Sequence, residues 1–422
     1  MSNFARLLAD ANAEALSGST VTALGRDEQP ILNGVPYRVF RQSIDLCERR
    51  REGIFFSGPD LAREVAGLLH AKMPVGGLAL DPTCGIGDLL LAYAEHLPIE
   101  ATLEATVDSW GRQLAGIEKR AELAAMARAR LVVLARARGR FVEPVARIDG
   151  CFPAIIVGNM FEESERIAQA DGLLFNPPFG QTSDHTVSDW GTGQLSASAL
   201  CLDSLVAKRA PAAPIAAVLP EVLRCGTRYA RFRTRLADAG LGGHFASRGR
   251  FDAWTNVDVF TTLLESGVSY LWQLPAIVSA TVGNRFTVRV GSVVPHRHAD
   301  EGRWYRFACA KTVPAWSTGF VPETGRRFQG TTHVPPFVVV RRTSSPGDRK
   351  RAVGAIILGD SPVAVENHLI VLTPNDGRFE SCAELLAVLA RDATTDYLNR
   401  VIRCRHLTTS SVMGIPWVAT DE

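Results

Sequence analysis

The sequence is poor in lysine and has no pair of cysteines spaced for metal or redox chemistry. Its 422 residues include five lysines and eight well-separated cysteines. No secretory leader and no apolar run long enough to cross a membrane is visible, so we expect a cytoplasmic protein with reduced thiols and no membrane partner. His296, His298 and Cys309 lack the number and spacing of zinc ligands, and we therefore expect no metal.

Motifs for nucleotide hydrolysis and DNA cleavage are also missing. The sequence has no Gly-x-x-x-x-Gly-Lys-Ser/Thr loop and no Pro-Asp…Asp/Glu-x-Lys pattern, so any cleavage activity would reside in a partner. The formal net charge is only +2, which confines any nucleic-acid surface to local patches. The 41 arginines suit phosphate and guanine contacts, although a GC-rich genome produces the same bias without a functional cause.

The pattern of apolar segments divides the chain into three regions. Residues 1–50 read as a helical and mixed lead-in, with the clearest helix at 4–9. Residues 51–270 alternate short apolar strands with helical stretches, which predicts an α/β, doubly wound, Rossmann-like sheet. Residues 271–422 predict a second, β-rich carboxyl-terminal domain. Its expected strands lie at 286–290, 337–340 and 355–358, and its expected helices lie at 382–390 and near 395.

An apolar strand that ends in Asn176-Pro177-Pro178-Phe179 is the most informative motif. Two consecutive prolines can neither continue a strand nor enter a helix, so the chain leaves the sheet rigidly at this point. Open α/β sheets bind ligands at this end of their strands. An amide, a backbone carbonyl and an aromatic face together suit a planar base that carries an exocyclic amine. A plain Pro-Pro turn is the structural alternative.

Upstream, a strand ending at Asp81 is followed by a turn that carries Gly85 and Gly87. Glycines let the backbone turn sharply and approach a ligand closely. The nicotinamide fingerprint would need a third glycine, which is missing. A carboxylate at the strand end instead favours a cofactor with an ammonium group, as in S-adenosylmethionine. We predict that Asp81, Pro82, Cys84, Gly85 and Gly87 bind this cofactor.

The next two strands also end in polar residues. Residues 114–118 read as a strand ending in Glu118, a carboxylate placed to bind the two ribose hydroxyls of a cofactor. Its alternative role is to cap the following helix. The strand at 154–158 precedes Asn159, whose amide could contact the adenine edge of the cofactor.

The order of these motifs resembles the amino-methyltransferases that modify adenine N6 in DNA. The likeness is to modification subunits and fused enzymes of type I, II and IIG restriction–modification systems, and it covers residues 50–270. It includes Phe56 and Ser57, in a segment that closes over the methionine end of the cofactor in that group, although the group more often has Thr-Pro there. Ser57 also reads as a helix N-cap, with Pro59 in the first turn.

The resemblance implies methyl transfer from S-adenosylmethionine to the N6 amine of an adenine flipped out of double-stranded DNA. The Asn176 side-chain oxygen and the Pro177 carbonyl would accept the two N–H bonds of that amine. Pro178 would keep the turn rigid and Phe179 would stack on the base. Asn176 also counts among the residues expected to line the cofactor site.

Two further features have a functional and a plain structural interpretation. Phe251, Trp254 or Phe260 could form a second wall of the base pocket, although core packing is the alternative for each. The polar loop 181–194 could order over the base or the DNA, although it could equally be a disordered surface loop.

The carboxyl-terminal region supplies dispersed cations of the kind that bind backbone phosphates. Residues 363–372 and 406–410 resemble, more loosely, the target-recognition domains of type I and related systems. We therefore expect 271–422 to recognise DNA. The predicted DNA contacts are Arg326, Arg327, Arg341, Arg342, Arg349, Arg351, Arg403 and Arg405.

Other functions fit the same motifs. An Asn-Pro-Pro-aromatic motif can also hold an RNA base or a protein glutamine amide, and a DNA-binding subunit could retain the fold without catalysis. A type I modification subunit would need a separate specificity subunit. The expected partners are therefore double-stranded DNA together with restriction nuclease or specificity subunits, in restriction, phage defence or epigenetic marking.

Overall fold

The computed structural model describes residues 3–17, 29–45, 48, 53–145, 148, 150–182, 186–252, 255, 257–269 and 280–417. Its contacts divide the chain into two compact units. Unit 1 comprises Met1–Arg224 and Arg228–Trp272, and unit 2 comprises Cys225–Thr227 and Gln273–Glu422. The lead-in predicted for residues 1–50 falls within unit 1.

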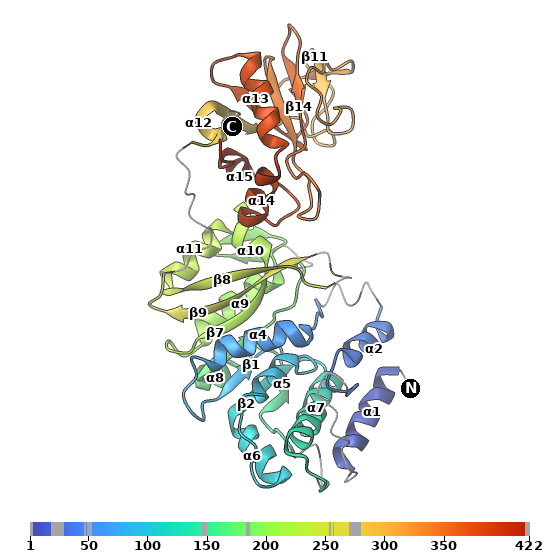
Figure 1. Ribbon diagram of the computed structural model, residues 1–422, viewed down its shortest axis with the longest axis vertical. Coiled ribbons are helices and arrows are strands. Elements are labelled where there is room, and N and C mark those ends of the chain that lie inside the picture. The colour runs from blue at the N-terminus through green and yellow to red at the C-terminus, as the bar shows by residue number, and fades with distance from the viewer. Residues whose placement is uncertain are drawn as a thin grey trace. The chain divides into compact units, whose positions relative to one another are not determined.

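Unit 1 is built on a seven-stranded sheet with the order β3-β2-β1-β4-β7-β9-β8 (Figure 1). The strands from β3 to β7 run parallel, while β9 is antiparallel to both β7 and β8. The chain order reverses between β1 and β4, where a doubly wound sheet opens its ligand crevice. This sheet confirms the predicted fold class. The strands are β1 (Ala79–Asp81), β2 (Leu114–Glu118), β3 (Ile155–Val157), β4 (Gly172–Phe175), β7 (Ile215–Pro220), β8 (Leu241–Arg250) and β9 (Asp258–Ser266).

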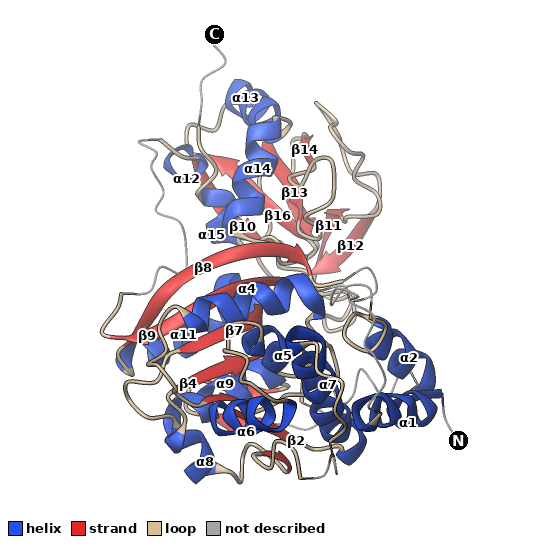
Figure 2. Ribbon diagram, turned by 60° about the horizontal axis from the view of Figure 1, so that its bottom comes forward, coloured by secondary structure: helices blue, strands red, loops and turns tan. Residues whose placement is uncertain are grey.

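Helices cover both faces of this sheet (Figure 2). Side chains alternate along a strand, so Leu174 of β4 joins one apolar core while Leu173 and Phe175 join the other. The helices of the first core are α4 (Gly58–His70), α5 (Asp88–Ala94), α6 (Leu103–Gln113) and α7 (Ala121–Gly139). Those of the second core are α8 (Ser164–Gln169), α9 (Ala197–Lys208) and α11 (Ala230–Asp238).

The amino-terminal helices belong to the first core. The helix predicted at residues 4–9 is confirmed as α1 (Asn3–Leu16), which packs beside α7, and α2 (Val35–Ser43) follows it. Buried Arg136 of α7 donates to the Ala15 carbonyl at 2.7 Å, and buried Arg130 donates to the Ile31 carbonyl at 2.8 Å. Arg130 also donates to the Ile86 carbonyl at 2.7 Å, inside the glycine turn. The lead-in is thus tied to the segment that bears the predicted cofactor motif.

Unit 2 is β-rich, as predicted. Its two larger sheets have the orders β10-β16-β13-β14 and β12-β11-β15. The stretch 363–372, which resembles target-recognition domains, holds two strands in different sheets, separated by a turn at 366–368. The strands are β10 (Phe286–Val290), β11 (Arg303–Ala308), β12 (Gly325–Phe328), β13 (Phe337–Arg341), β14 (Gly354–Ile357), β15 (Val363–Val365) and β16 (Leu369–Pro374). The helices are α12 (Val282–Arg285), α13 (Phe379–Leu389), α14 (Asp392–Val401) and α15 (Thr409–Met413).

The burial of Arg351 contradicts its predicted contact with DNA. Its side chain is completely buried within unit 2. Its guanidinium donates to the Cys404 carbonyl at 2.8 Å, to the Ile402 carbonyl and to Ser344 Oγ at 3.3 Å. Arg351 therefore links α14 and the segment after it to the loop that follows β13. No face of its guanidinium is left to bind a phosphate.

Replacing Arg351 by methionine is expected to destabilise unit 2 by about 3 kcal/mol or more. The substitution keeps an apolar stem but leaves several buried carbonyls without a donor. Denaturant unfolding of the full chain measures the loss. Arg349→Met, at an exposed position two residues away, is the matched control and should change stability by less than ~0.5 kcal/mol. Equal effects of the two substitutions would contradict the assigned role of Arg351.

Candidate functional site

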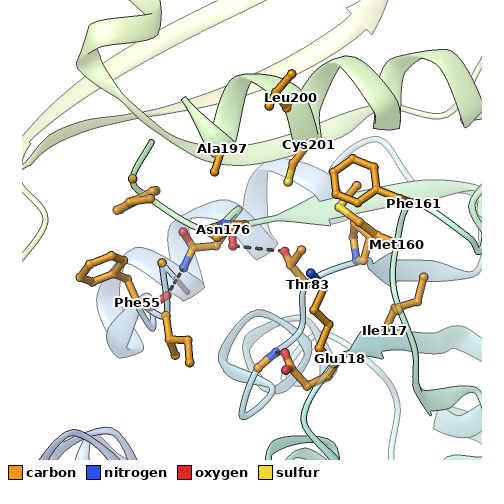
Figure 3. A pocket seen from close by; sticks show the side chains of 18 of the residues that line it. Phe55, Thr83, Ile117, Glu118, Met160, Phe161, Asn176, Ala197, Leu200 and Cys201 are labelled. Atoms are coloured by element: carbon orange, nitrogen blue, oxygen red, sulfur yellow. Dashed lines mark hydrogen bonds between the residues drawn. The ribbon is translucent and has the colours of Figure 1, made fainter. Parts of the chain in front are cut away.

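A cavity of about 1010 Å³ lies in unit 1, where the strand order reverses. It brings together the ends of β1, β2 and β4 with the start of α9 (Figure 3). Seven of the predicted site residues line it: Phe56, Pro82, Gly85, Glu118, Asn176, Pro178 and Phe179. Three sequence motifs that are far apart in the chain therefore share one space.

The Asn176 side chain is held in one orientation. Its Nδ2 donates to the Phe55 carbonyl at 3.0 Å and to Ser57 Oγ at 3.0 Å. Its Oδ1 is buried and has no hydrogen-bond partner within the described part of the chain. A buried acceptor without a donor is unfavourable, so this oxygen is a preformed site for an N–H group of a ligand.

The same contact corrects the predicted role of Ser57. Ser57 stands at the N-cap position of α4 and Pro59 lies in the first turn, as predicted. Its side chain makes no capping hydrogen bond. The Ser57 hydroxyl instead accepts a hydrogen bond from Asn176 Nδ2, because the Asn176 side chain lies next to it.

The backbone around the two prolines is fixed on both sides. Thr83 Oγ1 donates to the Asn176 carbonyl at 3.2 Å, and Ser198 Oγ donates to the Pro178 carbonyl at 2.9 Å. No described residue donates a hydrogen bond to the Pro177 carbonyl that lies between them. The Asn176 side-chain oxygen and the Pro177 carbonyl are thus two neighbouring acceptors without a donor among the described residues, although Pro177 itself is not one of the residues that line the cavity.

Phe179 lies against two other rings. Its centroid is 5.5 Å from that of Phe55 in a stacked arrangement and 4.9 Å from that of Phe251 in an edge-to-face one. Phe251 is therefore placed beside the site, while Phe260 is buried in the core on the other face of the sheet. Trp254 lies outside the described residues.

The glycine turn is shaped by close approach. Gly85 has φ +53°, and a Cβ there would lie 2.8 Å from the Phe56 ring. Gly87 has φ +82°, and its Cβ would lie 2.9 Å from that of Ala127. Cys84 packs its sulfur against Gly116 instead of lining the cavity. Gly85 therefore lines the cavity. Gly87 and Cys84 instead allow the turn to pack closely against Ala127 and Gly116.

Glu118 holds the start of α7, which was its alternative role, and its contact with ribose hydroxyls stays a prediction. Its Oε2 accepts the Gly85 N–H at 3.0 Å, and its Oε1 accepts the Arg120 N–H at the start of α7 at 2.9 Å. Each carboxylate oxygen has a second lone pair, so the carboxylate can still accept from hydroxyl groups in the cavity. Burial raises the pKa of Glu118, and the backbone donors oppose this shift.

Asp81 lies just behind the cavity wall and is almost inaccessible. Its Oδ1 accepts the Thr83 N–H at 3.0 Å. Burial raises the pKa of Asp81 to about 8, with a smaller contribution from the nearby charge of Glu118. A carboxyl group in this position gains from a cationic ligand group, which would stabilise its ionised form.

Asn159 is not brought into the cavity. Its side chain binds locally, accepting from the Phe161 N–H at 3.3 Å and donating to Glu162 at 3.1 Å. Its neighbours Gly158, Met160 and Phe161 line the cavity instead. The predicted contact of Asn159 with a cofactor stays a prediction.

Several lining residues were not predicted from the sequence. α9 contributes Ala197, Leu200 and Cys201, which lie opposite Glu118 across the cavity in Figure 3. Burial raises the pKa of the Cys201 thiol to about 12, so this group is a small apolar wall and not a nucleophile. Thr83 also lines the cavity, and it could have been predicted from the sequence, because it is a hydroxyl residue directly after the end of the first strand.

The polar loop 181–194 contains a short hairpin of β5 (Thr186–Ser188) and β6 (Gly191–Gly193). Residues 183–185 of this loop lie outside the described residues. Gln181, Thr182, Thr186 and Gln194 line the cavity. The loop thus adds polar groups to the wall, beside Glu118 and Asn176.

Gly53 allows the segment before α4 to cross the Asn-Pro-Pro-Phe motif. It has φ +67°, and a Cβ would lie 2.5 Å from the Phe179 carbonyl oxygen and 2.7 Å from Pro178 Cβ. We expect Gly53→Ala to lower the free energy of unfolding by about 1–3 kcal/mol more than Gly58→Ala. Gly58 is the matched control, because its φ is +69° but nothing lies within 4 Å of its Cβ position. Equal losses in thermal or denaturant unfolding would contradict the proposed close approach.

The remaining predicted DNA contacts of unit 2 differ in exposure. Arg327, Arg349 and Arg405 are exposed. Arg326 donates to the His298 carbonyl at 3.0 Å, and Arg341 donates to the Val313 carbonyl at 3.3 Å. Arg342 and Arg403 are half-buried.

The described residues contain neither a metal-binding cluster nor a helix that could cross a membrane. No cluster of three or more His, Cys, Asp or Glu residues within them could hold a metal ion. None of their helices combines the length and the apolar character needed to cross a membrane.

Comparison with known proteins gives matches at the level of structure. No family model matches the chain, and no curated protein sequence matches it. Among solved structures, the type IIL restriction-modification enzyme MmeI in complex with DNA superposes with a TM-score of 0.54 at 12% identity, over 93% of this chain and 72% of MmeI. This similarity shows a shared fold.

Two further structures are similar at lower scores. The type IIG restriction endonuclease BpuSI has a TM-score of 0.47 at 13% identity, over 92% of this chain and 61% of its own. The DrdV–DNA complex has a TM-score of 0.48 at 12% identity, over 58% of this chain and 30% of its own. This chain thus spans less than two thirds of the length of either protein. The fold of this chain is a doubly wound sheet with an added β-rich unit.

Proposed function

We propose that this chain transfers a methyl group from S-adenosylmethionine to the N6 amine of an adenine in DNA. The observation that carries the proposal is the buried, unpartnered Oδ1 of Asn176, a residue that lines one cavity with Glu118 and the glycine turn. The adjacent carbonyl of Pro177 also has no donor among the described residues. Two acceptors side by side match the two N–H bonds of an exocyclic amine.

These acceptors suit the chemistry of the amine. The nitrogen lone pair of adenine N6 is delocalised into the ring, which makes the amine a poor nucleophile. Asn176 Oδ1 and the Pro177 carbonyl would accept one N–H each and draw the nitrogen toward tetrahedral geometry, so that its lone pair becomes available. Because Phe55 and Ser57 hold the amide, this geometry is set before the base arrives. No strong general base is required.

The residues of the cavity fit S-adenosylmethionine. Glu118 would accept hydrogen bonds from the ribose hydroxyls. Asp81 does not line the cavity, but its carboxylate behind the wall would favour the charge of the ammonium group. Gly85 lets the Phe56 ring pack closely against the turn, and both residues line the cavity. When bound, the cofactor would supply a methyl group already activated by its sulfonium, so these residues need only bind and orient.

The target base would leave the duplex to reach this cavity, at a cost of a few kcal/mol. Phe179, which lines the cavity and packs on Phe251, would recover part of this cost by contact with the base. Unit 2 would then provide recognition of the surrounding DNA, as part of a restriction–modification or phage-defence system. The similarity in fold to MmeI supports this assignment.

Modified-base sequencing of DNA from cells that express the chain tests the proposal. The expected result is N6-methyladenine in a discrete sequence motif, which disappears in cells that express Asn176→Ala. A second culture that co-expresses the neighbouring genes covers the case of a required partner subunit. Unmodified DNA in both cultures would overturn the proposal, and methylated RNA or protein glutamine would then identify the substrate.

A further inference from the structure

A second concave site lies in unit 2, apart from the cavity described above. It is a pocket of about 520 Å³ where the ends of β11 and β13 meet the turn between β15 and β16. Lys311 follows β11, Arg341 ends β13, and Glu366 and His368 come from the turn. Its remaining polar lining is Thr343 and His296.

The cations of this pocket are not neutralised by the protein. Lys311 is exposed and has no polar partner among the residues that the structure describes. Within the described residues, the side chain of Arg341 makes one hydrogen bond, at 3.3 Å, to the carbonyl of Val313. Positive charges that converge on a concavity without acidic partners attract an anion.

The one carboxylate among the lining residues already has partners. Glu366 Oε2 accepts the Ala310 N–H at 2.9 Å, and Glu366 Oε1 contacts His368 Nδ1 at 3.0 Å. The side chain of Glu366 is only 14% exposed, whereas that of His368 is 52% exposed. Glu366 therefore orients the imidazole of His368, which leaves its Nε2 as a further group at the open side of the pocket.

We propose that this pocket binds a backbone phosphate of DNA, with Lys311 and Arg341 as its cations and His368 as an oriented hydrogen-bond partner. Phosphate fits better than a base edge because the pocket offers cations and donors while its carboxylate is engaged. A metal ion is not suited, since the described residues hold no group of three ligands. The inference rests on the proposed function, because it names a contact of unit 2 with the DNA substrate.

The salt dependence of DNA binding tests the phosphate contact. Binding of a fluorescent 30-base-pair duplex to the full chain is measured by anisotropy between 50 and 200 mM KCl, without cofactor. Loss of one phosphate contact lowers the slope of log K against log [salt] by about 0.9. We expect this change for Lys311→Gln, together with roughly 5- to 10-fold weaker binding at 100 mM salt.

Arg378→Gln is the charge-matched control. It removes one positive charge from an exposed position of the same unit, outside the pocket. It should leave the salt slope unchanged. Equal slopes for the wild-type chain and Lys311→Gln would overturn the proposal, as would failure of the wild-type chain to bind the duplex at 50 mM salt.

Glu366→Gln separates a phosphate from a base edge. Gln can still accept the Ala310 N–H but removes a negative charge, so a phosphate ligand predicts binding about 2- to 5-fold tighter. Weaker binding would mean that the DNA donates a hydrogen bond to Glu366, which would overturn the phosphate assignment. These measurements need no methyl transfer, so they succeed or fail independently of the activity proposed for the Asn176 site.

Discussion

Substitution of Asn176 by alanine is expected to reduce methyl transfer by at least about 10²- to 10³-fold while it leaves cofactor affinity nearly unchanged. The substitution removes one of the two acceptors that would hold the target amine. Loss of one preorganised hydrogen-bonding group typically lowers the rate of the chemical step by this factor. It also removes the amide that Phe55 and Ser57 orient. The remaining cavity wall, including Glu118 and Gly85, stays in place.

Single-turnover methylation of a duplex with the identified motif measures the rate, and calorimetry measures cofactor binding. Gln169→Ala, which removes an exposed amide from α8, is the control for loss of an amide as such and should keep the wild-type rate. A rate for Asn176→Ala within about threefold of wild type would remove Asn176 from the reaction. A parallel loss of cofactor affinity would point to collapse of the cavity instead.

Replacement of Asp81 by asparagine is expected to weaken cofactor binding and, at the same time, to stabilise the cofactor-free protein at pH 8. Burial raises the pKa of Asp81 to about 8, whereas the carboxyl group ionises near 4 in the unfolded chain. The folded state therefore holds its proton more tightly between these values. Stability falls as the pH rises from about 4 to about 8, because only the unfolded chain ionises freely over that range.

Asparagine cannot ionise, so it removes this penalty. The melting temperature of Asp81→Asn should match wild type near pH 4 and exceed it increasingly up to pH 8, by roughly 2–4 °C for each kcal/mol recovered. Cofactor affinity should fall about 5-fold or more, since the buried carboxylate no longer attracts the cationic group of the cofactor across the cavity wall. Thermal melts across pH and calorimetry at pH 8 check both. A melting difference that does not vary with pH would contradict the position assigned to this carboxyl group.

The sequence predicted the central strands well because they are buried on both faces. The run that ends at Phe175 is apolar throughout, and such runs are typical of the interior of a parallel sheet. β8 was not predicted, because it is an edge strand whose Gly242 and Gly243 and polar residues hide any alternation. β11 and β12 were missed for a similar reason, since arginines occupy much of both strands.

Single side chains were predicted less well than motifs, because tertiary contacts decide them. Ser57 has the local signature of a helix cap, yet Asn176, more than a hundred residues away, takes its hydroxyl. Arg351 belongs to a basic run that resembles a DNA-binding surface. Its burial depends on hydrogen bonds to carbonyls at residues 398–404. The sequence around Arg351 does not indicate that these carbonyls lie near it.

The contact of Asn176 with Phe55 and Ser57 has a consequence for how this protein could be divided or rearranged. The sheet carries the Asn-Pro-Pro-Phe segment, but the rotation of its amide is set by a separate piece of chain at residues 53–57. A shortened form that begins at α4 would retain every strand of unit 1 and still lose the orientation of its key side chain. Circular permutants and split versions should therefore keep residues 53–57 joined to α4, even where the strands alone would be sufficient for folding.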